Sequence, residues 1–176
     1  MMIKIAVVDY KINNVLSIVK AFKQINILSD VIDDISKLSN YKFIVIPGVG
    51  SFDRGMHGLN QMGFVSEFEK LVQNQHYFLG ICLGMQLFFE RSEEGNQNSI
   101  GLSAIKGKCK KLVVSNDISV PHVGWNIVNI FQDSPLTKNL DSKFHAYFVH
   151  SYYADLDNKK NLLAYSQHGL EFPAIV

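Results

Sequence analysis

Residues 77–84 read Tyr77-Phe78-Leu79-Gly80-Ile81-Cys82-Leu83-Gly84, an apolar β-type run that ends in a cysteine flanked by glycines. The run has the composition of a buried strand, and we expect a helix to follow from Leu83 to about Arg91. A G-x-C-x-G sequence between strand and helix is typical of a nucleophile elbow. Its glycines relieve crowding around a sharply turned residue, whose side chain then projects from the top of the sheet.

The residues before this turn alternate between strand and helix signals. Strands are predicted at residues 3–8, 29–32 and 43–46, and the last is an apolar run of the kind found in central parallel strands. Helices are predicted after a cap at Asn13 or Asn14, and around residues 64–72. The alternation predicts an α/β fold with a mostly parallel sheet flanked by helices, with ligands bound beyond the carboxyl ends of the strands.

The second half of the chain is β-rich and contains no convincing long helix. Strand signals fall at residues 107–114, 126–130, 146–153 and 162–166. We interpret them as a partly antiparallel extension of the same domain. No linker, repeat or low-complexity segment divides the chain, so we expect one domain over residues 1–176.

Composition limits the classes of function. A formal net charge of +1 argues against a nucleic-acid binder, and the short cluster Lys106, Lys108, Lys110 and Lys111 has the alternation of a solvated strand. The sequence has no membrane span, no signal-peptide pattern and no metal-ligand spacing. We therefore expect a cytoplasmic protein with no cofactor.

Cys82 is the candidate nucleophile. A helix N-terminus aimed at its sulfur would favour the thiolate, and the Leu83 N–H would lie where an oxyanion forms. A cysteine without such a context is usually a small buried apolar residue, which is how we interpret Cys109. The sequence Pro47-Gly48-Val49-Gly50 follows the neighbouring strand, so we expect the amide of Val49 or Gly50 to act as a second oxyanion donor.

Four motifs together resemble those of a known family. The elbow in its longer form, residues 80–87, resembles that of the class I (triad) glutamine amidotransferases. Residues 47–52, 120–126 and 147–153 narrow the resemblance to the glutaminase subunits of imidazole glycerol phosphate synthase. The similarity runs from about residue 3 to residue 176, with the motifs in the right order.

The resemblance implies a flavodoxin-like fold, a reaction and a set of site residues. Cys82 would attack the side-chain amide of L-glutamine, release ammonia and form a glutamyl thioester that water hydrolyses. Ammonia would pass to a cyclase (synthase) subunit in a heterodimer that serves histidine biosynthesis. Residues implied in substrate binding are Gly48, Gln86, Glu94, His150, Ser151 and Tyr152. Residues implied at the partner interface are His122, Trp125 and Asn126.

Two features depart from the family pattern. The family's triad takes a histidine and a glutamate from a late Phe-His-Pro-Glu motif, which this sequence lacks, and the most economical interpretation is that the chain is cut short at its C-terminus. His168 is a poor substitute, because Gln167-His168-Gly169 has the composition of a polar turn. In addition, residues 11–14 lack the glycines that the family usually has after Asp-Tyr.

Three other functions fit the sequence less well. The same glutaminase chemistry could serve an enzyme that amidates sugars for surface polysaccharides, and the loop at residues 11–14 motivates this alternative. The absent histidine and glutamate motivate a catalytically dead subunit that only binds its partner. A cysteine hydrolase or stress protein of similar architecture would leave residues 121–126 and 150–153 unexplained.

Overall fold

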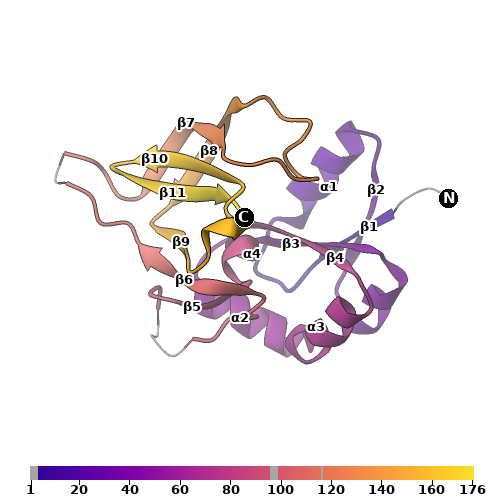
Figure 1. Ribbon diagram of the computed structural model, residues 1–176. Coiled ribbons are helices and arrows are strands. Elements are labelled where there is room, and N and C mark those ends of the chain that lie inside the picture. Colours follow the sequence, from indigo (N-terminus) through magenta and orange to yellow (C-terminus); the bar gives the residue numbers. More distant parts are fainter. Residues whose placement is uncertain (1–3, 96–98, 116) are drawn as a thin grey trace.

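The computed structural model describes residues 4–95, 99–115 and 117–176. Its central sheet has the order β2 (Leu28–Ile32), β1 (Lys4–Val8), β3 (Phe43–Gly48) and β4 (Tyr77–Cys82), and all the pairs are parallel (Figure 1). This 2-1-3-4 order is flavodoxin-like and confirms the predicted parallel sheet. Ile3, the predicted start of the first strand, lies outside the described residues.

Helices cover both faces of this sheet. Figure 1 shows α2 (Phe52–Gln61) and α3 (Phe64–Gln73) below the sheet and α1 (Val15–Gln24) above it. Asn14 caps α1 by accepting a hydrogen bond from the Ser17 N–H, as predicted. The main core lies between the sheet and the pair α2 and α3, where the buried apolar side chains include Ala6, Val8, Ile44, Ile46, Phe52, Leu59, Phe64 and Phe68.

The helix α2 was not predicted, because its glycines weaken the helical signal. In the structure these glycines allow close packing. A Cβ on Gly58 would lie 2.6 Å from the Tyr10 carbonyl oxygen, and one on Gly55 would lie 3.0 Å from the Leu87 side chain. Tertiary contacts therefore override the helix propensity of this segment.

The helix predicted from Leu83 to about Arg91 is wrong in length. The helix α4 covers only Leu83–Gln86, and the chain then forms β5 (Phe89–Ser92). Amides of the loop at residues 102–105 bind the carbonyls of Leu87, Phe88 and Phe89, at 2.8 to 3.3 Å. The carbonyls that follow α4 therefore pair with a distant segment, and the helix ends.

The second half of the chain forms two further sheets. One has the order β5, β6 (Ile105–Lys111) and β9 (Tyr152–Leu156), with β5 parallel and β9 antiparallel to β6. The other is antiparallel, with the order β11 (Leu170–Ile175), β10 (Ala164–His168), β7 (His122–Ile130) and β8 (Lys143–His150). The predicted strand at residues 146–153 is thus two strands, β7 begins four residues earlier than predicted, and β11 was not predicted. Short 3-10 helices lie at Ile35–Asn40 and Lys159–Asn161.

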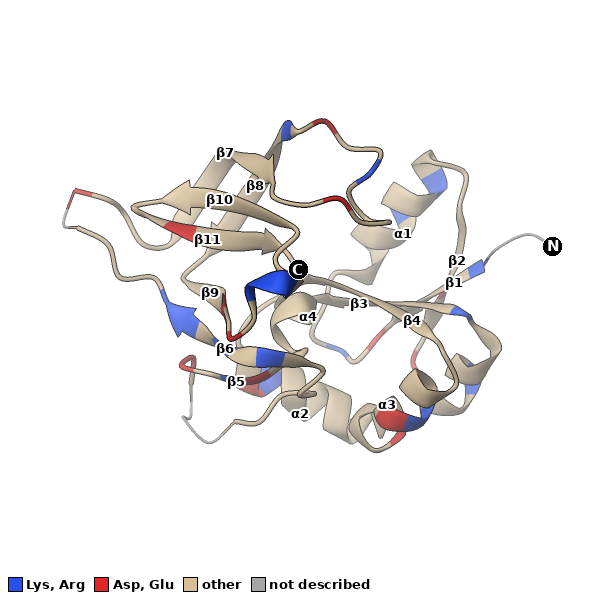
Figure 2. Ribbon diagram, in the orientation of Figure 1, with Lys and Arg blue, Asp and Glu red and all other residues tan. Residues whose placement is uncertain are grey.

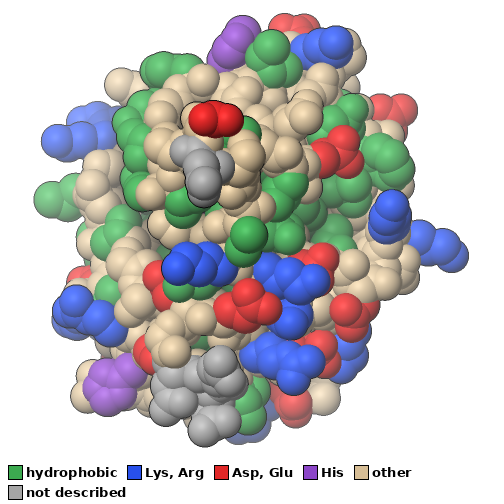
Figure 3. All heavy atoms as spheres, turned by 90° about the vertical axis from the view of Figure 1, so that its left-hand side faces the viewer, with side chains coloured by type: hydrophobic (Ala, Val, Ile, Leu, Met, Phe, Trp, Pro, Cys, Tyr) green, Lys and Arg blue, Asp and Glu red, His purple; other side chains and the backbone are tan. Residues whose placement is uncertain are grey.

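Three of the four lysines of β6 form ion pairs with nearby acidic residues. Lys106 pairs with Glu90 at 2.7 Å, Lys108 with Glu93 at 3.1 Å and Lys110 with Asp155 at 2.7 Å. These acidic residues lie on or just after the neighbouring strands β5 and β9, where Figure 2 shows red segments near the blue ones of β6, and basic side chains lie among acidic ones on the face shown in Figure 3. The segment therefore offers no uninterrupted positive patch. In the part of the chain that the structure describes, no helix is long and apolar enough to cross a membrane.

We predict that Gly84→Ala destabilises the fold severely. The added Cβ would lie 1.8 Å from the Ile46 carbonyl oxygen, a backbone atom of a central strand that cannot move aside. The expected loss in the free energy of unfolding is about 3 kcal/mol or more, measured by urea denaturation. Gly55→Ala is the matched control, because its Cβ would meet only the ends of flexible leucine side chains, and it should change stability by about 1 kcal/mol or less. Equal stabilities of the two variants would contradict this account.

Candidate active site

Cys82 lies at the junction of β4 and α4 in a strained backbone conformation. Its φ of 57° and ψ of −120° are unusual for a residue with a side chain, as a nucleophile elbow requires. The flanking glycines permit the turn, because a Cβ on Gly80 would lie 2.5 Å from the Gly84 carbonyl oxygen. Cys82 is exposed, so the thiol can reach a substrate.

The environment raises the pKa of the Cys82 thiol above its usual value. The main cause is partial burial, which removes water from the thiolate, and the Glu94 carboxylate adds a smaller effect. The Leu83 N–H acts in the opposite direction because it hydrogen-bonds to the sulfur. That amide therefore points at the reacting sulfur, and its role as an oxyanion donor stays a prediction.

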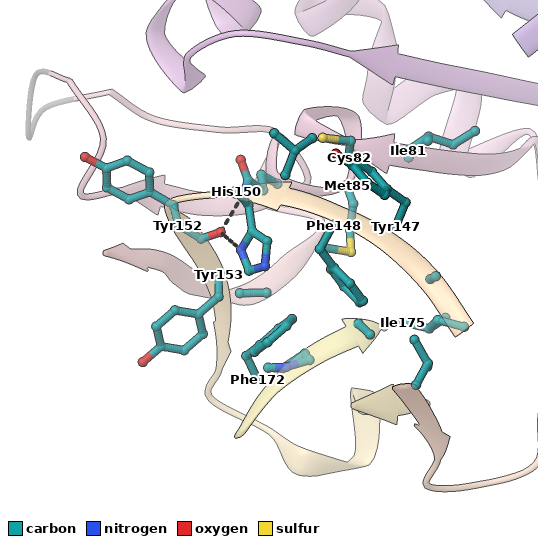
Figure 4. A pocket seen from close by; sticks show the side chains of 18 of the residues that line it. Ile81, Cys82, Met85, Tyr147, Phe148, His150, Tyr152, Tyr153, Phe172 and Ile175 are labelled. Atoms are coloured by element: carbon teal, nitrogen blue, oxygen red, sulfur yellow. Dashed lines mark hydrogen bonds between the residues drawn. The ribbon is translucent and has the colours of Figure 1, made fainter. Parts of the chain in front are cut away.

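Cys82 opens onto a cavity of about 400 Å³. Figure 4 shows the cavity walls, which come from β4 and α4 on one side and from β8, β9 and β11 on the other. Lining residues that the sequence did not indicate include Met85, Phe148, Tyr153, Phe172 and Ile175. They are ordinary core residue types, and all of them except Met85 of α4 lie on strands whose non-local pairing could not be predicted.

The segment Pro47-Gly48-Val49-Gly50 lies beside the cysteine. Gly48 is the parallel partner of Cys82, and a Cβ there would lie within 2.8 Å of Leu83 and Gly84 atoms. Gly50 has a φ of 89°, which favours glycine. The Val49 N–H is engaged elsewhere, because it donates to the Ile12 carbonyl over a nitrogen-to-oxygen distance of 3.4 Å.

The loop that provides the Ile12 carbonyl is itself strained. Lys11 has a φ of 68°, in the region that glycine adopts most readily. The Asp9 carboxylate holds this conformation by accepting hydrogen bonds from the Lys11 backbone N–H at 2.9 Å and from its ammonium at 3.0 Å. Beneath the loop, the buried Tyr10 hydroxyl donates to the Pro47 carbonyl at 2.6 Å. The Tyr10 contact could not be predicted from the sequence.

Gln86 and His150 meet at one backbone carbonyl. The Gln86 Nε2 donates to the Tyr152 carbonyl at 3.1 Å, and the His150 Nδ1 lies 2.9 Å from the same oxygen. All three residues line the cavity, and Figure 4 shows the His150 ring turned back toward Tyr152. Ser151 is not among the lining residues, and its carbonyl accepts a hydrogen bond from the Leu112 N–H.

Glu94 lies at the N-terminus of α2. Its Oε2 accepts a hydrogen bond from the Phe52 N–H at 2.9 Å, which satisfies an otherwise unpaired amide of the first helical turn. Burial raises the pKa of this carboxyl, and its charge acts on both Cys82 and Cys109. Glu94 is thus half-buried and fixed in place, and is not part of a fully solvated charge run.

The residues implied at a partner interface separate onto two faces of β7. Trp125 is 71% exposed, which excludes a core position. With its neighbours it forms an apolar face, defined here as the β7–β8 face, which comprises Val123, Trp125, Ile127, Tyr147 and Val149. His122 points the other way and is only 4% exposed, so it does not belong to the β7–β8 face, and its place at a partner interface stays a prediction. Asn126 is half-buried beside it.

The described histidines near the cavity are engaged in other contacts. Both ring nitrogens of His150 have partners, namely the Tyr152 carbonyl and the His122 Nδ1 at 3.0 Å. The His168 Nε2 lies 2.8 Å from the Ser119 carbonyl, and its ring stacks on His122 with the ring centroids 4.1 Å apart. Neither is placed as a free general base for Cys82. Among the described residues, no group of three or more His, Cys, Asp or Glu could hold a metal ion.

Comparison with known proteins agrees with this geometry. The family model for class-I glutamine amidotransferase matches residues 6–176. The HisH subunit of imidazole glycerol phosphate synthase from Caldanaerobacter subterraneus subsp. tengcongensis is 37% identical, over 98% of this chain and 83% of the relative. The Prochlorococcus marinus HisH subunit is 39% identical, over 97% of this chain and 79% of the relative.

The chain belongs to the HisH family of class-I glutamine amidotransferases. Solved structures agree on the fold. A crystal structure of a glutamine amidotransferase superimposes with a TM-score of 0.72 at 13% identity, over 97% of this chain and 89% of that one. The structure of PurLQS from Thermotoga maritima superimposes with a TM-score of 0.71 at 17% identity, over 97% of this chain and 78% of that one.

We predict that an electrophile modifies Cys82 of this amidotransferase chain and spares Cys109. Cys109 is fully buried, and burial raises the pKa of its thiol to about 12. Because the pKa of the Cys82 thiol is also raised, its alkylation by iodoacetamide should still accelerate at pH 9, above the usual thiol pKa of about 8.5. Peptide mass mapping against time and pH measures both effects. Labelling that persists in Cys82→Ser and disappears in Cys109→Ser would contradict the assignment.

Proposed function

We propose that the chain hydrolyses L-glutamine at Cys82 and passes the ammonia to the cyclase subunit of an imidazole glycerol phosphate synthase, in histidine biosynthesis. The observation that carries the proposal is the strained, exposed Cys82 at the mouth of a cavity, in a chain 37% to 39% identical to HisH subunits. Nucleophilic attack on the amide carbon forms a thioester, and nitrogen leaves as ammonia once it gains a proton.

The cavity suits one amino acid with a polar end. Gln86 and the backbone N–H groups of residues 150–152 would hold the α-ammonium and α-carboxylate, with Gly48 nearby and Glu94 contributing negative charge. The apolar wall of Met85, Phe148 and Ile175 would exclude water from the reacting amide. The Leu83 N–H would stabilise the oxyanion together with an amide of residues 49–50.

The hydrogen bond of the Val49 N–H supports a gated oxyanion site, in which this amide becomes available only after the backbone changes conformation. The Val49 N–H is bonded to Ile12 and so cannot also donate to an oxyanion. A rotation of the peptide between Gly48 and Val49 would redirect it, and glycine on one side lowers the cost of that rotation. One oxyanion donor is worth roughly 3 to 4 kcal/mol, or two to three orders of magnitude in turnover.

The exposed β7–β8 face supports a partner at this end of the molecule. A patch of aromatic and branched side chains in water is the usual mark of a protein interface, and tryptophan and tyrosine are enriched among the residues that dominate binding energy. The proposed occupant is the cyclase. Trp125 and Tyr147 contact each other in its centre, with ring centroids 5.8 Å apart.

We also propose that the general base and its carboxylate are supplied from outside residues 1–176. The family motif Phe-His-Pro-Glu is absent from the sequence, and both ring nitrogens of His150 are engaged. A triad cysteine without its base would lose at least two to four orders of magnitude in rate. The coding sequence downstream of Val176 tests this directly, and a continuation without a histidine and a glutamate would overturn it.

We predict that Gln86→Ala raises the KM for glutamine about tenfold or more and lowers kcat much less. The proposed contact is to the non-reacting end of the substrate, so its loss weakens the ground state and the transition state alike. Steady-state glutaminase assays with the cyclase present provide both constants. An unchanged KM with a large fall in kcat would exclude this role for Gln86.

We predict that the protein alone hydrolyses glutamine very slowly and that the cyclase raises this rate a hundredfold or more. Glutamate release should be measured with and without the cyclase and its acceptor. Trp125→Ala should weaken activation, because it removes the largest side chain of the β7–β8 face. Val72→Ala is the matched control, since Val72 is an exposed apolar residue on α3, which lies on the other side of the parallel sheet from β7 and β8 (Figure 1). Equal rates with and without the cyclase would rule out gating.

A further inference from the structure

Three histidines gather behind the glutamine cavity in a position that the proposed chemistry does not use. His122, His150 and His168 lie on β7, β8 and β10 and pack together with the rings of Phe148 and Phe172. His122 is almost fully buried at their centre. A buried imidazole needs hydrogen-bond partners. Here the partners form a line of hydrogen bonds that runs from Asn126 through His122 and His150 to the Tyr152 carbonyl.

The direction of every hydrogen bond in this line is fixed by chemistry. The Tyr152 carbonyl can only accept, so the His150 Nδ1 must donate to it. A neutral His150 then accepts at Nε2, and the His122 Nδ1 donates to it at 3.0 Å. His122 in turn accepts at Nε2 from the Asn126 Nδ2 at 3.2 Å. Both rings are therefore Nδ1–H tautomers.

Asn126 sets the start of the line. Its Nδ2 also donates to the Gln167 carbonyl at 2.8 Å, and its Oδ1 accepts from the Ile127 N–H at 2.8 Å. These two bonds leave only one orientation for the amide group. The second N–H of Asn126 must then point at His122. Asn126 therefore determines that the His122 Nε2 accepts, and with it the donor-to-acceptor direction of the whole line.

Burial keeps both rings neutral. It lowers the pKa of His122 to about 4, with further effects from His168 and His150, and it lowers the pKa of His150. Protonation of His122 would place a donor at Nε2 opposite the Asn126 N–H, so the line exists only with neutral rings. At neutral pH the line is intact.

The other end of the line reaches the substrate cavity. The Tyr152 carbonyl accepts from the His150 Nδ1 and from the Gln86 Nε2, and so uses both lone pairs. Because that oxygen cannot donate, Gln86 must turn its NH₂ group toward Tyr152. Its Oε1 remains as the acceptor available to a ligand in the cavity that Gln86 lines.

We propose that His122 and His150 are positioning residues, which through the Tyr152 carbonyl hold the Gln86 amide in the orientation that binds glutamine. The proposal rests on the glutaminase function proposed above. It assigns neither histidine to proton transfer. The role differs from a purely structural one because it sets the position of the Tyr152 carbonyl, and that carbonyl determines which end of the Gln86 amide meets the substrate.

The kinetic test uses the full-length subunit in complex with the cyclase and compares three variants. His122→Phe keeps the stacked ring but removes the donor to His150, and it should raise the KM for glutamine about tenfold with kcat changed less than twofold. His122→Asn offers an N–H near the position of Nδ1 and should recover part of the KM. His168→Phe is the matched control, because His168 stacks on His122 but lies outside the line, and its KM should equal that of the wild type. Equal KM values for His122→Phe and the wild type would overturn the proposal.

A second measurement does not depend on activity. Long-range ¹⁵N–¹H correlation spectra at pH 7 should show His122 and His150 as Nδ1–H tautomers in the wild type, with His122→Phe releasing His150 to a tautomer mixture. An Nε2–H tautomer at His150 in the wild type would overturn the line of hydrogen bonds whatever the kinetics. A wild-type complex that releases no glutamate would instead overturn the proposed function, and the spectra would still decide the line.

Discussion

The contact on which the structure depends is the approach of the Gly84 backbone to the Ile46 carbonyl, so close that no side chain fits between them. It presses the first turn of α4 against the end of β3, while Gly80 allows α4 to fold back over β4. Cys82 lies between these two glycines and has no alternative to its left-handed conformation. The exposed thiol, the Leu83 amide aimed at it and the neighbouring Gly48 all follow from this packing. The site is thus specified by backbone proximity more than by its polar side chains.

The parallel half of the fold could be predicted because its signals are local. The strands β1, β3 and β4 are apolar runs that stop at turn residues, and the glycine-flanked cysteine identifies the strand-to-helix turn. The length of α4 could not be predicted, because amides some fifteen residues further along the chain take the carbonyls that would continue it. The strand β11 was missed for a related reason. Its pairing with β10 across Gly169 matters more than its own composition, which includes a proline.

Within the site, Cys82 and the segments beside it could be predicted from the sequence. The placement of the β7 side chains could not. Alternation along β7 would ordinarily bury Trp125 and expose His122 and Asn126. The structure does the reverse, since the apolar side chains face solvent and the histidine lies under Phe148 and Phe172. A conflict between pattern and placement of this kind is expected where a surface has a task besides stability. The sequence indicated the right strand but could not indicate which of its faces turns inward.

The strained loop at Lys11 has a consequence for how the enzyme can diverge among relatives. The carbonyl that holds the Val49 amide belongs to Ile12, and its position depends on a lysine kept in a glycine-like conformation by Asp9. Neither Lys11 nor Asp9 is among the residues that line the cavity at Cys82. The proposed gating therefore predicts that substitutions in this loop alter the activity without the partner and leave the chemistry at Cys82 unchanged. The rate of glutamine hydrolysis without the partner and the rate with the partner could then be selected independently.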